Sequence, residues 1–378
     1  MIDVLYDARF ITQRQTGVGR VSEMLLRTFL EEAPELNLHV LYKKPFDKTL
    51  EGNNPICTAT AFDSHPWGDM YRNTVLRKII KNRRIDLYFS PAFYVIQMAG
   101  HIKQVVLIHD LAAFDQSHSL KRSFRTYLKQ MIFSALRNAT HITTPSEFIR
   151  AGLVEMRPDL ADRIDAVHLG VNPVFRHYDD AKAEALRRYY CLPARFILSV
   201  ATVEPRKNLL NLLDAYAIYS KRASAPLQLI IVGGDGYRSK DIHRRAEQSD
   251  ISTGTRFLGY IPDNELALLL GMADCMVFPS LYEGFGLPVI EAMAAGCPVI
   301  TSTRASLPEV AGGAALLVDP EDVSQIEKAL RQMTSDSALR KKLSIEGKKR
   351  AEKMTWSVTA GKYIRIFQKT VEAGEKEK

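Results

Sequence analysis

Two carboxylates flank a glycine-bearing loop in the segment 278–301, FPSLYEGFGLPVIEAMAAGCPVIT. The pattern predicts a strand that ends at Pro279, a loop that contains Glu283, and a helix with Glu291 one turn inside it. Helical side chains lean toward the helix N-terminus, so both carboxylates can flank one ligand at the loop. A carboxylate accepts two hydroxyl hydrogen bonds at once, which suits a ribose or a sugar diol.

The loop itself, Gly284-Phe285-Gly286, lets the backbone approach a ligand closely. The first N–H groups of the following helix offer an anion site. We therefore assign these three residues, with Glu291, to ligand binding. In the alternative interpretation Glu291 is a solvated helix residue and the glycines only turn the chain, but two carboxylates around one such loop favour the functional one.

A basic pair, Arg206 and Lys207, stands between a strand and a helix in the segment 199–216, SVATVEPRKNLLNLLDAY. Asn208 is the predicted N-cap of that helix, so both cations lie beside a positive helix end. Two cations and a helix N-terminus form a diphosphate site that needs no metal. No acidic DxD-type cluster stands ready to hold Mg²⁺ or Mn²⁺, so we expect no metal.

Two further candidates lie in the first half of the chain. His109, followed by Asp110, ends a hydrophobic strand, where it is either structural or part of a site. Gly17 and Gly19 precede an amphipathic helix, but Ser22 occupies the third position of GxGxxG. This spacing argues against a dinucleotide site and favours a loop at the edge of a cleft.

The elements that must position these residues follow an alternating pattern of short apolar runs and longer helical stretches, typical of parallel sheets. Six strand candidates precede a polar segment and six follow it, which predicts two doubly wound α/β domains. The strands are expected at 2–7, 38–42, 86–90, 104–109, 140–144 and 164–168, then at 196–200, 227–232, 256–259, 275–279, 298–301 and 315–318.

The domain boundaries follow from this pattern. We expect a first Rossmann-like domain at 1–175, a linker with one helix at 176–192, a second Rossmann-like domain at 193–355, and a C-terminal helix at 356–378 that packs back toward the first domain. Right-handed crossovers place the strand C-termini of each sheet at one edge, and two such edges facing each other would form a cleft.

Composition excludes several classes of protein. With 46% hydrophobic and 25% charged residues among 378, the chain is neither disordered, collagen-like nor coiled coil. It has no apolar run of about 20 residues, the length that spans a bilayer, and its acidic N-terminus does not resemble a signal peptide. Its four cysteines lack CxxC spacing, which fits a reducing, cytoplasmic location.

The net charge of +8 is concentrated in one window. Between Tyr71 and Arg137, twelve Lys or Arg face three acids, a surplus of nine that exceeds the charge of the whole chain. The stretches 71–84 and 120–137 place apolar residues at helical spacing beside these cations, as helices on an anionic membrane surface do. Ordinary surface helices are an equal alternative; nucleic acid is disfavoured, because no zinc-finger, RNA-binding or helix-turn-helix pattern is present.

Taken in order, these segments resemble the retaining glycosyltransferases of family 4, which have the GT-B fold of two Rossmann-like domains. The resemblance covers nearly the whole chain and is most specific in YEGFGLPVIEAMAAGCPVI (282–300). The other matching pieces are TGVGR (16–20), HDL (109–111), TPSEFIR (144–150), LGVNPVF (169–175), EPRKN (204–208) and VGGDG (232–236). The HDL and EPRKN segments are most similar to mannosyltransferases that build bacterial surface polysaccharides from GDP-mannose.

The resemblance implies a role for each candidate in the second domain. Glu283 would contact donor-sugar hydroxyls, Glu291 the nucleotide ribose, and Lys207 with Arg206 the diphosphate. Catalysis would involve His109, Glu283, Lys207 and Arg206.

In the first domain, Gly17 would lie near the phosphates and His109 near the donor sugar. Many members carry an additional Arg early in the loop before the lysine, where this chain has Ala201 and Thr202. Arg206 would then supply the second charge. Transfer would proceed on the front face, with a leaving phosphate oxygen helping to deprotonate the acceptor.

The implied activity is transfer of a hexose, mannose from GDP-mannose being favoured, to a saccharide or lipid-linked saccharide in surface polysaccharide or lipopolysaccharide synthesis. The enzyme would be cytoplasmic or peripheral on the inner face of the cytoplasmic membrane. The alternatives are a UDP-sugar-dependent transferase of the same fold, a nucleotide-sugar epimerase or phosphorylase, and a non-catalytic protein that binds membranes or nucleic acid.

Overall fold

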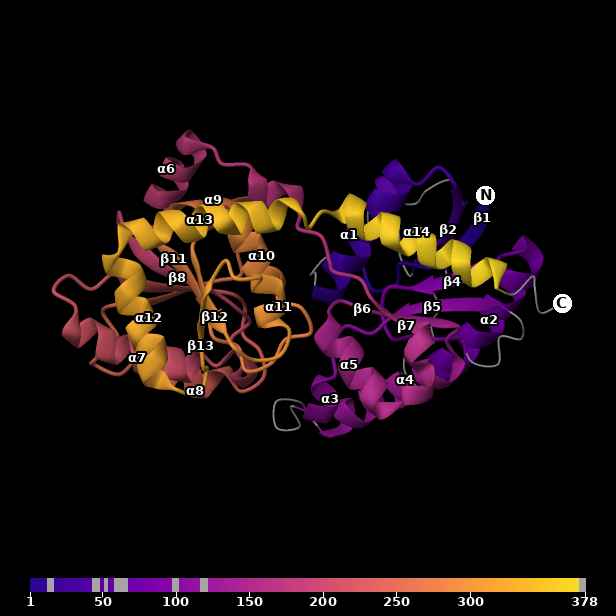
Figure 1. The fold of residues 1–378 in the computed structure, drawn as a ribbon, viewed down its shortest axis with the longest axis horizontal. Helices are drawn as coiled ribbons and strands as arrows, with labels where there is room; N and C mark the ends of the chain where they lie inside the picture. The colour runs from indigo at the N-terminus through magenta and orange to yellow at the C-terminus, as the bar shows by residue number, and fades with distance from the viewer. Residues whose placement is uncertain are drawn as a thin grey trace. The chain divides into compact units, whose positions relative to one another are not determined.

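The computed structural model describes residues 1–11, 17–42, 48–50, 54–57, 67–96, 102–115 and 122–373 (Figure 1). The chain forms two compact α/β units. The first comprises Met1–Ala113, Ser123–Gly170 and Trp356–Lys378, and the second Phe114–Arg122 and Val171–Thr355.

The first unit is built on a parallel sheet of seven strands in the order β3-β2-β1-β4-β5-β6-β7. The strands are β1 (Ile2–Asp7), β2 (Leu36–Tyr42), β3 (Asn54–Cys57), β4 (Leu87–Ser90), β5 (Lys103–Leu107), β6 (His141–Thr144) and β7 (Ile164–Ala166). Six of them match the expected strands. β3 was not expected, because its Pro55 argues against a strand; its position at the sheet edge explains why the proline is tolerated.

Helices pack on this sheet, and the C-terminal helix α14 is one of them. They are α1 (Gly17–Glu32), α2 (Trp67–Arg83), α3 (Ala112–Asp115), α4 (Arg122–Asn138), α5 (Glu147–Met156) and α14 (Trp356–Glu372). Figure 1 shows α14 lying beside α1 in the first unit. Its Phe367 packs 5.8 Å from Phe29 of α1 and 5.1 Å from Phe89 of β4, measured between ring centroids. The C-terminal helix is thus part of the first core.

The second unit has a parallel sheet of six strands in the order β10-β9-β8-β11-β12-β13. Its strands are β8 (Phe196–Val200), β9 (Gln228–Val232), β10 (Thr255–Gly259), β11 (Cys275–Phe278), β12 (Val299–Ser302) and β13 (Leu316–Val318). All six were expected within about a residue at each end. Fully buried side chains such as Ile197 and Val277 form its core.

The helices of this unit follow its strands. They are α6 (Asp180–Tyr189), α7 (Leu209–Arg222), α8 (Ser239–Ala246), α9 (Asp263–Met272), α10 (Leu287–Ala294), α11 (Leu307–Ala311), α12 (Val323–Ser335) and α13 (Ser337–Glu352). A single 3₁₀ turn, Pro205–Lys207, precedes α7. Within the described part of the chain, no helix of either unit has the length and apolar character to cross a membrane.

The segment 176–192, expected as a linker, belongs to the second unit. Asp179 caps α6, and Tyr190 donates a hydrogen bond to Glu265 of α9 at 2.9 Å. The ring of Tyr178 lies against Gly271, where an added Cβ would meet it at 2.4 Å. The segment is polar because α6 is an outer helix with one packed face, so polarity alone did not identify a linker.

Candidate functional site

Two loops that contain predicted site residues leave the second sheet at neighbouring positions. β8 and β11 are adjacent and parallel, and the strand order reverses between them. The loops 201–208 and 279–286 follow their carboxyl ends, which is where open α/β sheets bind ligands. A backbone hydrogen bond of 2.9 Å from Leu281 N to Arg206 O joins the two loops.

Asn208, the predicted N-cap, contributes to this junction in another way. It stands at the N-cap position of α7 with φ of 60°, but its side chain makes no capping hydrogen bond. Its Nδ2 instead donates to the carbonyl of Pro279 at 3.1 Å and to that of Pro320 at 2.6 Å. The predicted N-cap position is thus confirmed, but the side chain does not cap the helix; it ties α7 to carbonyls 71 and 112 residues away.

Glu283 lies at the centre of a buried cluster of charges. Its Oε1 accepts hydrogen bonds from Lys207 Nζ at 2.6 Å and Ser280 Oγ at 2.7 Å, and its Oε2 accepts from Arg206 Nη1 at 3.2 Å. The side chains of Lys207 and Glu283 are only 11% and 10% exposed, so water screens their attraction weakly. Arg206 also pairs with Glu204 at 3.0 Å, and the two positive charges are balanced by two negative ones.

The pKa of Glu283 shows which effect dominates in this cluster. Burial by itself raises the pKa of the carboxyl, because the charged form loses hydration. The Lys207 ammonium and the Arg206 guanidinium act in the opposite direction and hold the pKa below its usual value. Glu283 is therefore ionised at neutral pH and is the counter-ion of both cations.

Residues that were expected to have separate tasks therefore lie together in the structure. Lys207 and Arg206 are expected to hold a diphosphate, and Glu283 a sugar hydroxyl, yet the three form one cluster. No spacing rule indicated this pairing, since 76 residues separate Lys207 from Glu283. Ser280 carried no signal at all, because a serine after a strand is ordinary.

The loop that precedes α10 is held in a conformation that requires glycine. Gly286 has φ of +110°, and a Cβ added to it would lie 2.6 Å from Leu307. Ser306, fully buried, lies with its Oγ 2.9 Å from the carbonyl of Glu283 and 2.7 Å from that of Phe285. This serine, also missed from sequence, fixes the loop backbone beside α10.

Glu291 lies where the sequence placed it, about one turn inside α10, and is only 2% exposed. Gly284 and Phe285 lie in the loop before that helix, with Phe285 buried. The predicted residues of the second domain therefore all lie on the two loops at the reversal point or on the helix that follows one of them.

His109 and Gly17 belong to the first unit. His109 follows β5, and its Nε2 lies 2.7 Å from the carbonyl of Pro91. Since a carbonyl only accepts, Nε2 carries the proton, and burial lowers the pKa of the imidazole, which leaves it neutral. Gly17 and Gly19 were expected in a loop before the helix, but both lie inside α1, of which Gly17 is the first residue. A Cβ added to Gly17 would meet no atom within 4 Å, so its backbone is open to approach.

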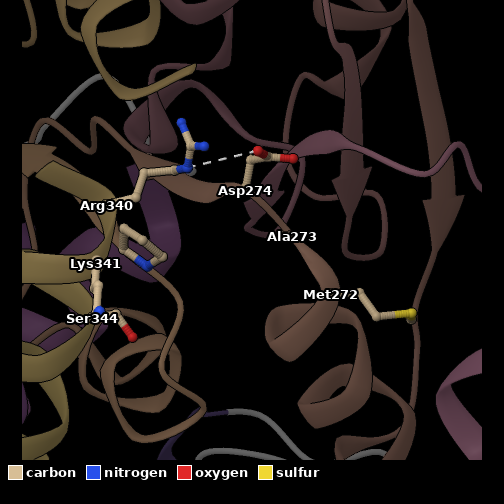
Figure 2. A pocket seen from close by; sticks show the side chains of 7 residues that line it. Met272, Ala273, Asp274, Arg340, Lys341 and Ser344 are labelled. Carbon is tan, nitrogen blue, oxygen red and sulfur yellow. Dashed lines mark ion pairs between the residues drawn. The ribbon is translucent and has the colours of Figure 1, made fainter. Parts of the chain in front are cut away.

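A cavity of about 300 Å³ lies at the opposite edge of the second sheet, and none of the predicted site residues lines it. Asp274 and Pro298 border it immediately before β11 and β12. Figure 2 shows Asp274 directed at Arg340 of α13, an ion pair of 3.8 Å. Asp274 also pairs at 2.7 Å with Arg195, which stands immediately before β8, so Asp274 joins the start of a neighbouring strand to α13.

Among the residues that the structure describes, no group of three or more His, Cys, Asp or Glu side chains gathers in a way that could hold a metal ion.

Comparison with known proteins gives a consistent result. The family model described as Glycosyltransferase Family 4 matches residues 17–175, and the model described as Glycosyl transferases group 1 matches residues 192–350. The chain is 31% identical to O-antigen chain mannosyltransferase B of Escherichia coli over 283 residues, which cover 75% of this chain and 74% of the relative.

A second relative is much longer than this chain. Serotype-specific mannosyltransferase WbdA of Escherichia coli is 28% identical over 72% of this chain and 34% of its own length, so the match spans about a third of WbdA. Among solved structures, sucrose-phosphate synthase from Thermosynechococcus elongatus has a TM-score of 0.81 at 19% identity. That alignment covers 98% of this chain and 99% of the other, and it shows the fold alone.

Proposed function

Because the chain belongs to the family 4 glycosyltransferases and has their GT-B fold, we propose that it transfers mannose from GDP-mannose to a saccharide or lipid-linked saccharide acceptor. It is a mannosyltransferase of O-antigen polysaccharide synthesis, as its similarity to O-antigen chain mannosyltransferase B and WbdA indicates. The observation that carries the donor site is the buried cluster of Glu283, Lys207 and Arg206 at the sheet's reversal point.

The donor is assigned to this cluster and to Glu291. The diphosphate binds Lys207 and Arg206, displacing part of their pairing with Glu283, whose carboxylate then accepts from hydroxyls of the sugar. Glu291, at the start of α10, binds the ribose diol. Negative charge grows on the leaving diphosphate as the anomeric C–O bond breaks, and preorganised cations stabilise it where it develops.

The acceptor hydroxyl attacks the face from which the diphosphate departs. A new C–O bond forms to the acceptor, and its proton passes to the leaving phosphate oxygen. His109 orients the sugar in this scheme: its Nε2–H is engaged by Pro91, so only Nδ1 remains, and Nδ1 accepts a hydrogen bond from a hydroxyl. Gly17 provides the open backbone near the phosphates.

The donor assignment is tested by following nucleotide release. Purified enzyme given GDP-mannose should release GDP at a high rate only when a mannose-terminated saccharide acceptor is present, and UDP-hexoses should release little UDP. A control without acceptor measures hydrolysis of the donor. Preferential turnover of a UDP-sugar would contradict the GDP assignment, while conversion of the donor without any acceptor would favour an epimerase or phosphorylase.

Metal independence is a second expectation, since Lys207 and Arg206 supply the charge that a metal would otherwise provide. Initial rates of mannose transfer in excess EDTA should equal those in buffer alone. Loss of turnover that Mg²⁺ or Mn²⁺ restores would overturn this assignment.

The basic window, most of which lies in the first unit, supports a membrane-associated acceptor. In the structure it includes α2 and α4, while residues 120 and 121 lie outside the described part. On α4, Arg122, Lys129 and Phe133 share one side by helical spacing, and Phe133 is 48% exposed. An exposed aromatic ring among cations fits a helix at an anionic lipid surface, on the cytoplasmic face, where a lipid-linked acceptor would be presented.

A further inference from the structure

Three side chains of the cluster described above donate hydrogen bonds to the Glu283 carboxylate: Arg206, Lys207 and Ser280. Of these three, only Ser280 is neutral. It lies two residues beyond β11 and is completely buried. Its Oγ is 2.7 Å from Glu283 Oε1, 3.1 Å from the carbonyl of Arg206 and 3.3 Å from that of Tyr282. A hydroxyl has one proton, and the carboxylate is both the nearest acceptor and the charged one, so it receives the strong hydrogen bond.

The two cations that contact Glu283, Lys207 and Arg206, must also bind the donor diphosphate in the proposed function. Lys207 and Arg206 must turn toward the donor diphosphate when it binds, because the same charges serve both partners. Their hold on the carboxylate then weakens at the moment when Glu283 must be correctly placed. Ser280 bears no charge and has no attraction for the diphosphate comparable with that of a cation, so its hydrogen bond persists.

We propose that Ser280 is a positioning residue for the transfer reaction: its hydroxyl holds the Glu283 carboxylate in place while Lys207 and Arg206 bind the diphosphate. This inference rests on the proposed function, in which Glu283 contacts the donor sugar. It assigns a role to a residue that touches neither donor nor acceptor and acts only through Glu283.

The charges around Glu283 determine what loss of the hydroxyl does to its titration. The loop after β8 presents Lys207 and Arg206, with Glu204 behind Arg206; α10 carries Glu291 and α11 carries Glu309. The cations and the Ser280 hydrogen bond lower the pKa of Glu283 against the effect of burial. Removing the hydroxyl therefore raises that pKa, most of all in the donor complex, where the cations are shared with the phosphates.

The test is the pH dependence of kcat in Ser280→Ala, which deletes one buried oxygen and adds no bulk. Turnover should fall about tenfold, and the acid limb of kcat should move upward by about one pH unit, the equivalent of one such hydrogen bond. Affinity for GDP, measured by calorimetry, should stay within about twofold of the wild type, since the cations remain. Circular dichroism of each variant over the same pH range measures its folded fraction, which separates a shift of the limb from acid unfolding.

Ser306→Ala is the matched control, because this serine is equally buried but contacts the carbonyls of Glu283 and Phe285, not the carboxylate. Its acid limb should coincide with that of the wild type. An unshifted limb in Ser280→Ala, or an equal shift in Ser306→Ala, overturns the positioning role. Wild-type turnover in Glu283→Gln would instead overturn the proposed function of Glu283 itself, so the two failures are distinguishable.

Discussion

Glu283→Gln should lower turnover about ten- to hundredfold and leave binding of free GDP at least as tight as in the wild type. The loss of turnover follows because a neutral amide accepts a sugar hydroxyl more weakly than a carboxylate. The retained binding follows from the cluster: without the Glu283 charge, Lys207 and Arg206 have one competitor fewer for the diphosphate. The measurements are steady-state kinetics and calorimetry with GDP.

Glu291→Gln should behave differently. Its proposed partner is the ribose, which is present in donor and product alike, so the affinities for GDP-mannose and GDP should both fall by about ten- to hundredfold. A matched control is Glu327→Gln, another glutamate of the second unit that is 2% exposed and pairs with Arg222 and Arg331. It should change neither quantity. Equal losses of GDP affinity in the Glu283 and Glu291 variants would refute the division of tasks.

Reversing four cations of the basic window, Arg77, Lys78, Arg122 and Lys129, to Glu should abolish sedimentation with anionic vesicles while GDP affinity stays unchanged. Each Lys or Arg near an anionic surface contributes about 1 kcal/mol, and four reversals also introduce repulsion. The measurement is co-sedimentation with vesicles that contain phosphatidylglycerol, at low and high salt, since screening should weaken binding of the wild type.

The control for this variant changes the same total charge elsewhere. Lys328, Lys342, Lys349 and Lys353 are exposed residues of α12 and α13 or just after them, in the second unit. Their reversal to Glu also takes the net charge from +8 to zero, but it should leave most of the vesicle binding intact. If the wild type ignores anionic vesicles at low salt, or both variants lose binding equally, α2 and α4 are ordinary solvated helices.

The arrangement of strands was accessible from sequence because buried parallel strands are apolar runs whose ends are marked by polar residues. Twelve runs were expected, and each corresponds to a strand of the structure. β3 was missed since its short run NPIC contains a proline, and only its place at the sheet edge permits that residue. The two-unit α/β class, confirmed by the family and fold comparisons, follows from the same runs.

The boundary between the units was harder to predict. A polar stretch is expected both for a linker and for an outer helix, and α6 proved to be the latter through contacts of Tyr178 and Tyr190 with α9. Whether a short polar helix packs on one face depends on residues far along the chain. Here the partner of Tyr190 is Glu265 of α9, which lies 75 residues later.

By itself, the sequence determined which residue types reach the carboxyl edge of the second sheet, because strand ends and helix starts are local features. The motif loops 201–208 and 279–286 were therefore placed correctly on their strands. What only the tertiary structure decided is their partnership: β11 pairs with β8 in register, so Lys207, Arg206 and Ser280 all converge on Glu283. Hydrogen bonds and ion pairs act over a few ångströms, and which atoms come that close is a property of the sheet order, not of spacing along the chain.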